Sequence, residues 1–340
     1  MSNNELLEKV ITNTTVGAAG GGLLNAEQAN RFIDYMWDAT TLANEGRVIR
    51  MRSNTVDLDK VSVGQRITRL ATEAVDDSVN VDATFTKITL TTKKLRLDWE
   101  LSSESLEDNI EGAALEDHIA RLMATQFGND VEDLAINGSS TSSDPLLKAF
   151  DGFRQLSLNS GRVVDAAGLY LNDDTNGGGK QLLSKAIKNM PRKYMQRRQD
   201  LRFYTGVNLQ QDYINGLTNV YSGRGNPPDI AGSVIRGDVV GPAGSAGHTV
   251  PFAYGIPIKE VPLFNESLTD STIGGGTAAL GYVELTFPQN RIWGIKRDVQ
   301  VHRNFSPKKD AIEYTVFVRT GVQIENPDAL VHVKNVRVAS

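Results

Sequence analysis

The sequence predicts an α+β protein whose folded body carries extended arms. One observation behind this is a long apolar stripe at helical spacing over residues 113–136. A second is a set of strand-like segments, with apolar alternation near residues 79–101 and the strongest pattern over 312–324. A third is the scarcity of large apolar side chains between residue 47 and Ile88, because such a stretch cannot build a core alone.

Composition limits the kinds of function. The 340 residues suffice for two domains, or for one large domain with extensions. A net charge of -5 argues against wholesale wrapping of nucleic acid, which needs a basic footprint. The chain has no cysteine, which excludes disulfides, thiolate metal sites and cysteine nucleophiles. It has no run of about 18 apolar residues and no signal-peptide layout, so we expect synthesis in a cytoplasm and no membrane contact.

The first segment reads as a flexible arm followed by a helix. Residues 1–24 are polar and small and end in a run of three glycines. Asn25 and Gln28 fit a capping box, and Ala29, Phe32, Ile33, Met36 and Trp37 then share one helical face. This helix could pack either on the core of its own chain or on a neighbouring subunit, and the sequence leaves both possibilities open.

The next segment, about 50 residues long, reads as an extended two-stranded arm. Apolar residues alternate, but their parity changes between Leu90 and Leu95, across the sequence Thr-Thr-Lys-Lys. A simple strand keeps one parity, so the change predicts a bulge, twist or turn. Because the arm has no core of its own, ordering it is favourable only when its apolar side lies on another surface.

The clearest helix of the sequence follows and ends at Asn137-Gly138. Its stripe consists of Leu115, Ile119, Leu122, Met123, Phe127, Val131 and Leu134. The helix and its lead-in are acidic, with Arg121 as the one basic residue against Glu104, Glu107, Asp108, Glu111, Glu116, Asp117, Asp130, Glu132 and Asp133.

Helices and strands mix in the rest of the chain. We expect helices over 182–190 and from Asn208, the latter with Gln three residues on, and a short strand over 201–205. Residues 222–250 are rich in Gly and Pro and predict a long surface loop. Further strands are expected over 257–261, 281–287, 293–301 and 312–324.

Catalytic, metal and cofactor motifs are not evident. The four histidines, His118, His248, His302 and His332, lie far apart without metal-ligand spacing, and no GxSxG elbow appears. The Gly-rich run before Lys180 fails the phosphate-loop pattern, which needs Gly where Asp174 stands and Ser or Thr where Gln181 stands. We therefore predict no catalytic, metal or cofactor residues, with a hydrolase built from scattered acids and histidines as the weakest alternative.

A basic region over 180–202 has two open interpretations. It contains eight Lys or Arg against the single acid Asp200. A charged and solvated helix face explains it as well as contact with phosphate or with an acidic neighbour does. The candidate contact residues are Arg192, Lys193, Arg197 and Arg198.

Charge is also divided between the arm and the long helix. The arm carries Lys87, Lys93, Lys94 and Arg96, and its apolar positions include Leu95, Leu97 and Trp99. The acidic face of the helix and its lead-in is represented by Glu104, Glu107, Asp108, Glu116 and Asp117. Exposed ion pairs contribute only about 0–1 kcal/mol each, so we expect this division to set register and partner choice.

The order of these elements resembles the major capsid proteins of tailed bacteriophages of the Hong Kong 97 type. The long helix closes in Glu132-Asp133-Leu134-Ala135-Ile136-Asn137-Gly138, similar to the acidic-acidic-x-Ala-x-x-Gly ending common in that family. Asp151-Gly152-Phe153 matches the family's short turn soon after it. The stretch 314–329, with its Asn-Pro-Asp-Ala ending, looks like the family's closing strand.

The resemblance implies a domain plan. It comprises an N-terminal arm and helix (1–48), an extended β loop (49–102), a peripheral domain with a spine helix (103–175), an axial domain (176–288) and a return to the peripheral domain (289–340). The arm residues given above would then make intersubunit contacts.

The resemblance also implies partners and a location. The subunit would form pentamers and hexamers of an icosahedral or prolate head, around double-stranded DNA on the inner face. A portal and a decoration protein are expected. Because only about 25 residues precede the first helix, either a longer scaffolding segment was removed or a separate scaffolding protein exists, and we expect the separate protein. The protein would assemble in the host cytoplasm and reside in the virion. An encapsulin-like compartment shell, which shares the architecture but holds enzymes, is the alternative.

Overall fold

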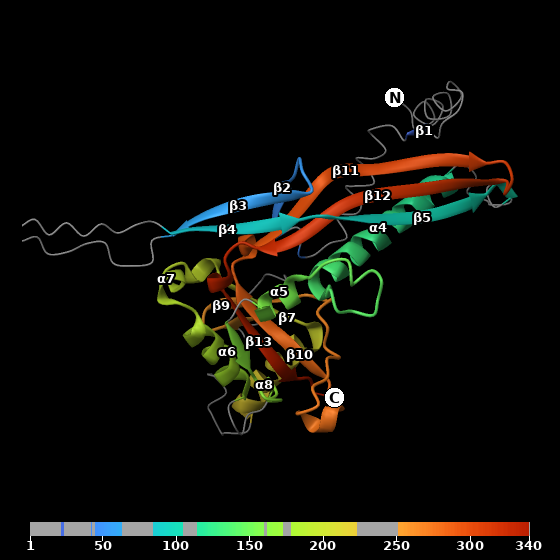
Figure 1. Ribbon diagram of the computed structural model, residues 1–340. Coiled ribbons are helices and arrows are strands. Elements are labelled where there is room, and N and C mark those ends of the chain that lie inside the picture. Colours follow the sequence, from blue (N-terminus) through green and yellow to red (C-terminus); the bar gives the residue numbers. More distant parts are fainter. Residues whose placement is uncertain are drawn as a thin grey trace, which may run out of the picture.

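The computed structural model describes residues 22–23, 42, 45–62, 84–104, 114–159, 162–172, 178–222 and 251–339. The predicted helix near residues 25–37 and most of the predicted loop over 222–250 lie outside these ranges. The described chain forms an elongated sheet with a long helix beside it, a second sheet flanked by helices, and a hairpin that stands off the body (Figure 1).

The elongated sheet contains the two longest strands, β11 (Arg291–Ser306) and β12 (Ala311–Ile324). Strand β5 (Lys93–Ser102) pairs antiparallel with β12 along its whole length. On the other side, β2 (Arg47–Arg50) runs parallel to β11, and β1 (Gly22–Leu23) pairs with the far part of β11.

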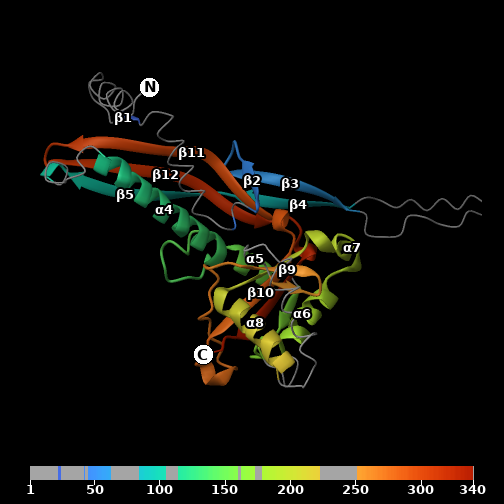
Figure 2. The same ribbon diagram turned by 180° about the vertical axis from the view of Figure 1, so that it is seen from behind.

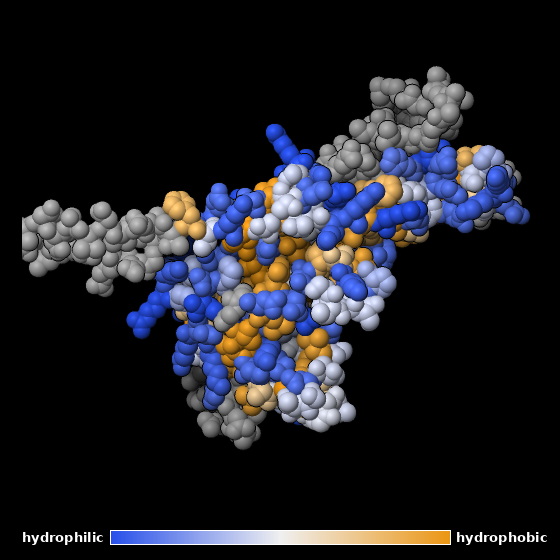
Figure 3. Space-filling model, viewed as in Figure 1, coloured by the Kyte–Doolittle hydropathy of each residue, from blue (hydrophilic) through white to orange (hydrophobic). Residues whose placement is uncertain are grey.

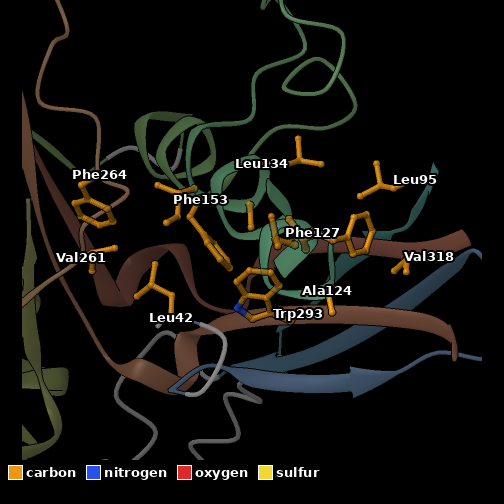
Figure 4. Packing of buried hydrophobic residues seen from close by; sticks show 14 of the residues in the cluster. Leu42, Leu95, Ala124, Phe127, Leu134, Phe153, Val261, Phe264, Trp293 and Val318 are labelled. Carbon is orange, nitrogen blue, oxygen red and sulfur yellow. The ribbon is translucent and has the colours of Figure 1, made fainter. Parts of the chain in front are cut away.

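Helix α4 (Ala114–Asn137) packs on one face of this sheet because most of its apolar stripe meets the inward residues of β5 and β12. Leu122 of the predicted stripe is the exception, since its side chain is 58% exposed. The shared core holds Leu95, Leu101, Phe127, Val131, Leu134, Val316 and Val318. Trp293 lies at its centre, fully buried, with the ring of Phe153 edge-on at 5.7 Å (Figure 4). The predicted helix over 113–136 is therefore confirmed.

The second sheet has six strands in the order β6 (Val163–Asp165), β13 (Leu330–Arg337), β10 (Leu280–Thr286), β7 (Arg202–Thr205), β9 (Ile256–Glu260) and β8 (Phe252–Ala253). Its helices are α5 (Phe153–Asn159), α6 (Gly178–Asn189), α7 (Arg192–Met195) and α8 (Val207–Ser222). Single 3-10 turns occupy Arg198–Asp200, Gly274–Gly276, Pro288–Asn290 and Pro327–Ala329. All seven residues of β10 are buried, which marks it as the centre of the second core.

Most strands and helices of this region match the sequence-based expectation within a few residues, but one cap does not. We predicted that Asn208 begins the helix that became α8, whereas the helix begins at Val207. The carboxylate of Glu266 accepts hydrogen bonds from the backbone N–H groups of Asn208 and Leu209, at 3.1 and 2.9 Å. Glu266, which is 58 positions from Asn208 in the sequence, therefore caps the helix. The local sequence around Asn208 cannot reveal such a distant cap.

Residues just before β2 contact both helix α4 and the second sheet. The backbone N–H of Leu42 donates to the buried carboxylate of Glu132 on α4 at 2.5 Å. Glu45 accepts from the Tyr204 hydroxyl at 2.9 Å and pairs with Lys259 at 2.5 Å. These contacts join the long helix to the second sheet. No helix in the described ranges is long and apolar enough to cross a membrane.

Candidate assembly interface: the projecting hairpin

Strands β3 (Thr55–Ser62) and β4 (Thr84–Thr91) form a separate two-stranded hairpin. Eight residue pairs join them, from Thr55 opposite Thr91 to Ser62 opposite Thr84. Both views show the hairpin extending away from the second sheet and from the long helix (Figures 1 and 2). The predicted two-stranded arm is confirmed. Isolated two-stranded hairpins are marginally stable in water, so this one depends on what lies against it.

The root of the hairpin is well held by its own chain. Leu90, Met51 and Ile292 form a small buried cluster. The Lys60 ammonium donates to the Asn326 side chain at 2.6 Å, and the Gln323 amide donates to the carbonyl of Thr89 at 3.1 Å. The hairpin therefore leaves the body in a fixed direction.

Two glycines that face each other across β11 and β12 make room for this root. Gly294 is opposite Gly321 in the strand register. A Cβ at Gly321 would lie 2.1 Å from the carbonyl oxygen of Thr91, and one at Gly294 would lie 2.8 Å from the Leu90 side chain. The chain crosses the sheet here at a distance that only glycine allows.

The crossing point is also where the apolar parity changes. Strand β4 ends at Thr91 and β5 begins at Lys93. The intervening Thr92 is buried, and its N–H and hydroxyl both donate to the carbonyl of Asn54, at 2.9 and 3.0 Å. The predicted irregularity is thus a one-residue break fixed by the turn that precedes β3.

Part of the expected arm lies in the sheet of its own chain, so the intersubunit role of its apolar residues stays a prediction. Leu95, Leu97 and Trp99 were expected to contact a neighbouring subunit, but β5 belongs to the sheet of its own chain. Leu95 is buried, Leu97 packs against the same core, and Trp99 stacks on Tyr314 with ring centroids 5.0 Å apart. The projecting part is therefore shorter than the expected loop over 49–102. The alternation of apolar and polar residues predicted the strand correctly, but it does not indicate whether the same chain or a neighbour covers the apolar side.

The basic residues of the arm also have contacts inside the chain. Lys87 pairs with Asp57 at 2.7 Å, and this hydrogen bond is the main reason that the pKa of Asp57 is lowered. Arg96 pairs with Asp98 at 2.6 Å, and the Lys94 ammonium lies 3.7 Å from the centroid of the Phe317 ring. Lys93 is exposed. All remain accessible to a neighbour, so their intersubunit role stays a prediction.

The acidic candidates that the structure describes are Glu104, Glu116 and Asp117, at the far end of the long sheet. Glu104 is exposed just after β5, while Glu116 and Asp117 fall in the first turn of α4. Glu107 and Asp108 lie outside the described residues. The exposed side chains at this end of the sheet are mainly hydrophilic (Figure 3).

Two of the four basic candidates beside the second sheet, Arg197 and Arg198, already contact groups of their own chain. Arg197 pairs with Asp200 at 2.8 Å and lies over the Phe287 ring, and the guanidinium of Arg198 donates to the carbonyl of Tyr254. Arg192 and Lys193 are exposed on α7. Contact of these four residues with DNA or a neighbour therefore remains a prediction.

A buried polar network was not anticipated from sequence. Glu284, Arg291 and His332 are each at most 2% exposed. The Glu284 carboxylate accepts from Arg291 at 2.5 Å and lies 3.2 Å from Nδ1 of His332, while the Arg291 guanidinium lies 4.0 Å from the Tyr204 ring centroid. The three residues come from β10, β11 and β13, so the network ties the two sheets together.

The network predicts how stability depends on pH. Burial alone would raise the pKa of Glu284, but Arg291 and His332 outweigh it and hold the pKa at about 2, below the ordinary 4.5. A carboxyl group with a lowered pKa stabilises the fold above its unfolded pKa and loses that contribution as the pH falls toward the folded value. Lowering the pKa from 4.5 to about 2 corresponds to roughly 3 kcal/mol.

Urea unfolding of the subunit between pH 7 and pH 2.5, compared with Glu284→Gln, isolates this contribution. We expect the difference in unfolding free energy between the two proteins to be constant above about pH 5 and to shrink below about pH 4.5. A difference that does not change over this range would show that Glu284 is not an ionised partner of Arg291.

The structure gives no support to the hydrolase alternative. It does bring one acid and one histidine together, Glu284 and His332, but both are buried and lie 3.2 Å apart within the internal network with Arg291. Within the described ranges no group of three or more His, Cys, Asp or Glu could hold a metal ion. His118 is exposed on α4, as expected for a solvated residue.

Comparison with known proteins agrees with this architecture over nearly the whole chain. No profile of a known protein family matches. YqbE of Bacillus subtilis (strain 168), provisionally named a prophage capsid protein, is 29% identical over 343 residues, covering 99% of this chain and all of YqbE.

The solved structures share the fold at low identity. A subunit of the satellite phage P4 procapsid, solved with its size determination protein, superposes with a TM-score of 0.58 at 14% identity, over 100% of this chain and 99% of that one. The capsid of an empty GTA particle gives 0.56 at 14% identity over 95% and 94%. Mycobacterium phage Bobi gives 0.55 at 12% identity over 95% and 93%.

The chain therefore has the Hong Kong 97-type fold of the phage capsids that it resembles.

Proposed function

We propose that this chain is a phage capsid protein, a structural subunit of the virion without enzymatic activity. It would form pentamers and hexamers of an icosahedral or prolate head around double-stranded DNA, with hairpin β3–β4 lying on a neighbouring subunit. The observation that carries the proposal is the contrast along the hairpin. Leu90 at the root is fully buried, whereas Phe85 near the far end of β4 is 74% exposed. A large aromatic side chain on a projecting hairpin is typical of a surface that another molecule covers.

Burial of its apolar side chains on a neighbouring subunit would supply the stabilisation that the isolated hairpin lacks. Obligate interfaces commonly bury about 2,000–5,000 Å², of which the apolar part contributes about 25 cal/mol per Å². Lost translational and side-chain freedom offsets much of this gain. Each contact can therefore be modest, because a closed shell repeats it many times.

The proposed domain plan follows the expectation from sequence, with one refinement. Residues 1–48 would be the N-terminal arm, 103–175 and 289–340 the peripheral domain, and 176–288 the axial domain. Within the proposed extended loop, 49–102, the described strands that project are β3 and β4 only. A separate scaffold, a portal, a decoration protein and assembly in the host cytoplasm complete the proposal.

Replacing Phe85 tests the role of the hairpin. We expect Phe85→Ser to lower the yield of particles at least about tenfold, because an interface anchor of this kind contributes more than about 1.4 kcal/mol. The free subunit should keep its stability within about 0.5 kcal/mol, since the side chain contacts little within its own chain. Sedimentation and electron microscopy give the yield, and Thr89→Ser, on the same face of β4, is the control.

If Phe85→Ser forms particles normally, Phe85 is not an anchor of the interface between subunits. Persistent monomers of the unaltered protein under all assembly conditions, including with a scaffold, would contradict the proposed function itself. Particles that hold protein cargo in place of genome-length nucleic acid would favour the compartment alternative.

A further inference from the structure

Three cationic side chains meet beside the root of the hairpin, on the face of the long sheet that α4 does not cover. Lys296 and Arg319 both donate to the side-chain oxygen of Asn54, at 2.5 and 2.7 Å. Lys94 is directly opposite Arg319 in the strand register, with its ammonium over the Phe317 ring. We call Lys94, Lys296 and Arg319 the basic root cluster.

The partners of this cluster are neutral. Within the described part of the chain, the groups that contact the three cations are an amide oxygen and an aromatic ring, and none of the three forms an ion pair with a carboxylate. The neighbouring cations are different, because Lys87 pairs with Asp57 and Arg96 pairs with Asp98. The cluster is thus a local excess of positive charge.

Such an arrangement has an energetic cost in the isolated subunit. Like charges directly opposite each other on neighbouring strands are destabilising. One amide oxygen cannot neutralise two cations, since it offers only a dipole. A carboxylate-bearing partner would turn the repulsion into attraction and would fix the register of contact.

We propose that the basic root cluster binds the acidic segment 104–117 of a second copy of this chain. This inference rests on the proposed function, because it requires copies to assemble. The segment contains six acidic residues and no Lys or Arg, and its acids are Glu104, Glu107, Asp108, Glu111, Glu116 and Asp117. Only the two in the first turn of α4 have a local explanation, the favourable interaction of negative charge with a helix N-terminus.

The segment cannot reach the cluster of its own chain. Lys94 stands near the start of β5 and Ser102 at its end, so the cluster lies about 26 Å from the point where the segment begins. The helix α4 also begins at that far end of the sheet (Figures 1 and 2). The nine residues 105–113 span at most about 30–35 Å, whereas reaching the cluster and returning needs about 50 Å. An acidic segment bound there must come from another molecule.

The geometry of this contact fits a closed ring. Glu104 follows the end of β5, whereas the basic root cluster lies beside its start, so the contact joins two different surfaces. A head-to-tail contact of this kind generates rings when its rotation closes. It would therefore act between successive subunits of a pentamer or hexamer.

Charge-swap variants test the proposal in the full chain, expressed with the proteins with which it assembles. A basic-reversed variant carries Lys94→Glu and Arg319→Glu, and an acid-reversed variant carries Glu107→Lys, Asp108→Lys and Glu111→Lys. We expect each to lower particle yield at least about tenfold, and a variant that carries both sets to recover to within about threefold of the unaltered protein. Lys148→Glu with Lys188→Glu makes the same change in net charge as the basic-reversed variant at two other exposed positions and should assemble normally.

A second measurement does not depend on assembly. A synthetic peptide of residues 104–117 should bind the isolated subunit at low salt and bind the basic-reversed subunit at least about tenfold more weakly. Circular dichroism melting confirms that each variant is folded. If the unaltered chain forms no particles but the peptide binds as expected, the proposed function fails while the charge contact stands.

Three outcomes overturn the proposal. The combined variant could remain as defective as either single set, or the basic-reversed variant could assemble normally with less nucleic acid inside, which would assign the cluster to phosphate contact. Equal binding of the peptide to both subunits would also overturn it.

Discussion

Replacing Gly321 with alanine is expected to destabilise the subunit by about 3 kcal/mol, because overpacking against backbone is costly and cannot relax easily. The new Cβ would lie 2.1 Å from the carbonyl oxygen of Thr91 and 3.2 Å from Cα of Thr92. To accommodate it, the chain would have to lift away from the sheet at the root of hairpin β3–β4. Urea unfolding of the purified subunit measures the loss, and particle yield should fall with it.

Gly294 provides the matched control, because it faces Gly321 in the strand register. A Cβ there meets the sulfur of Met51 at 2.7 Å and the Leu90 side chain at 2.8 Å, and such side chains can move. We expect Gly294→Ala to cost about 1 kcal/mol or less. Equal losses for the two variants would show that the crossing of the hairpin root over Gly321 is looser than described.

Removing the carboxylate of Glu284 is the second change with a large expected effect. Glu284→Leu should cost about 3–5 kcal/mol, because it leaves Arg291 buried without its ionic partner. Two further nitrogens of this guanidinium, Nε and Nη1, are already without a hydrogen-bond partner in the described structure. The loss would be measured by denaturant unfolding at neutral pH.

The double variant Glu284→Leu with Arg291→Met separates ion pairing from packing. A buried pair replaced by apolar residues of similar size is often neutral or stabilising, so the double variant should be more stable than Glu284→Leu alone. A double variant that loses the sum of the two single losses would mean that the residues act independently.

The sequence was informative where one local pattern decides the structure. The stripe from Leu115 to Leu134 predicts α4 because its period is that of a helix, whatever lies against it. The change of parity before Leu95 likewise predicts the break at Thr92, because side chains must alternate along a strand. The capsid fold could be predicted from the order of such elements.

The features that failed or were missed depend on contacts between distant residues. Alternation made β5 a strand but did not reveal that β12 of the same chain pairs with it, so Leu95 was assigned to a neighbour. Glu284 and His332 are 48 positions apart, and nothing near either residue predicts their pairing. The role of Gly321 appears only when the register places Thr91 above it.

The central claim is that hairpin β3–β4 is covered by a sister subunit, and a density map of assembled particles that resolves side chains tests it most directly. The account predicts Phe85 in contact with a neighbouring copy, and β3 and β4 lying across that copy's surface. Hairpins that stand free in solvent, or that fold back onto their own subunit in every position of the shell, would contradict it.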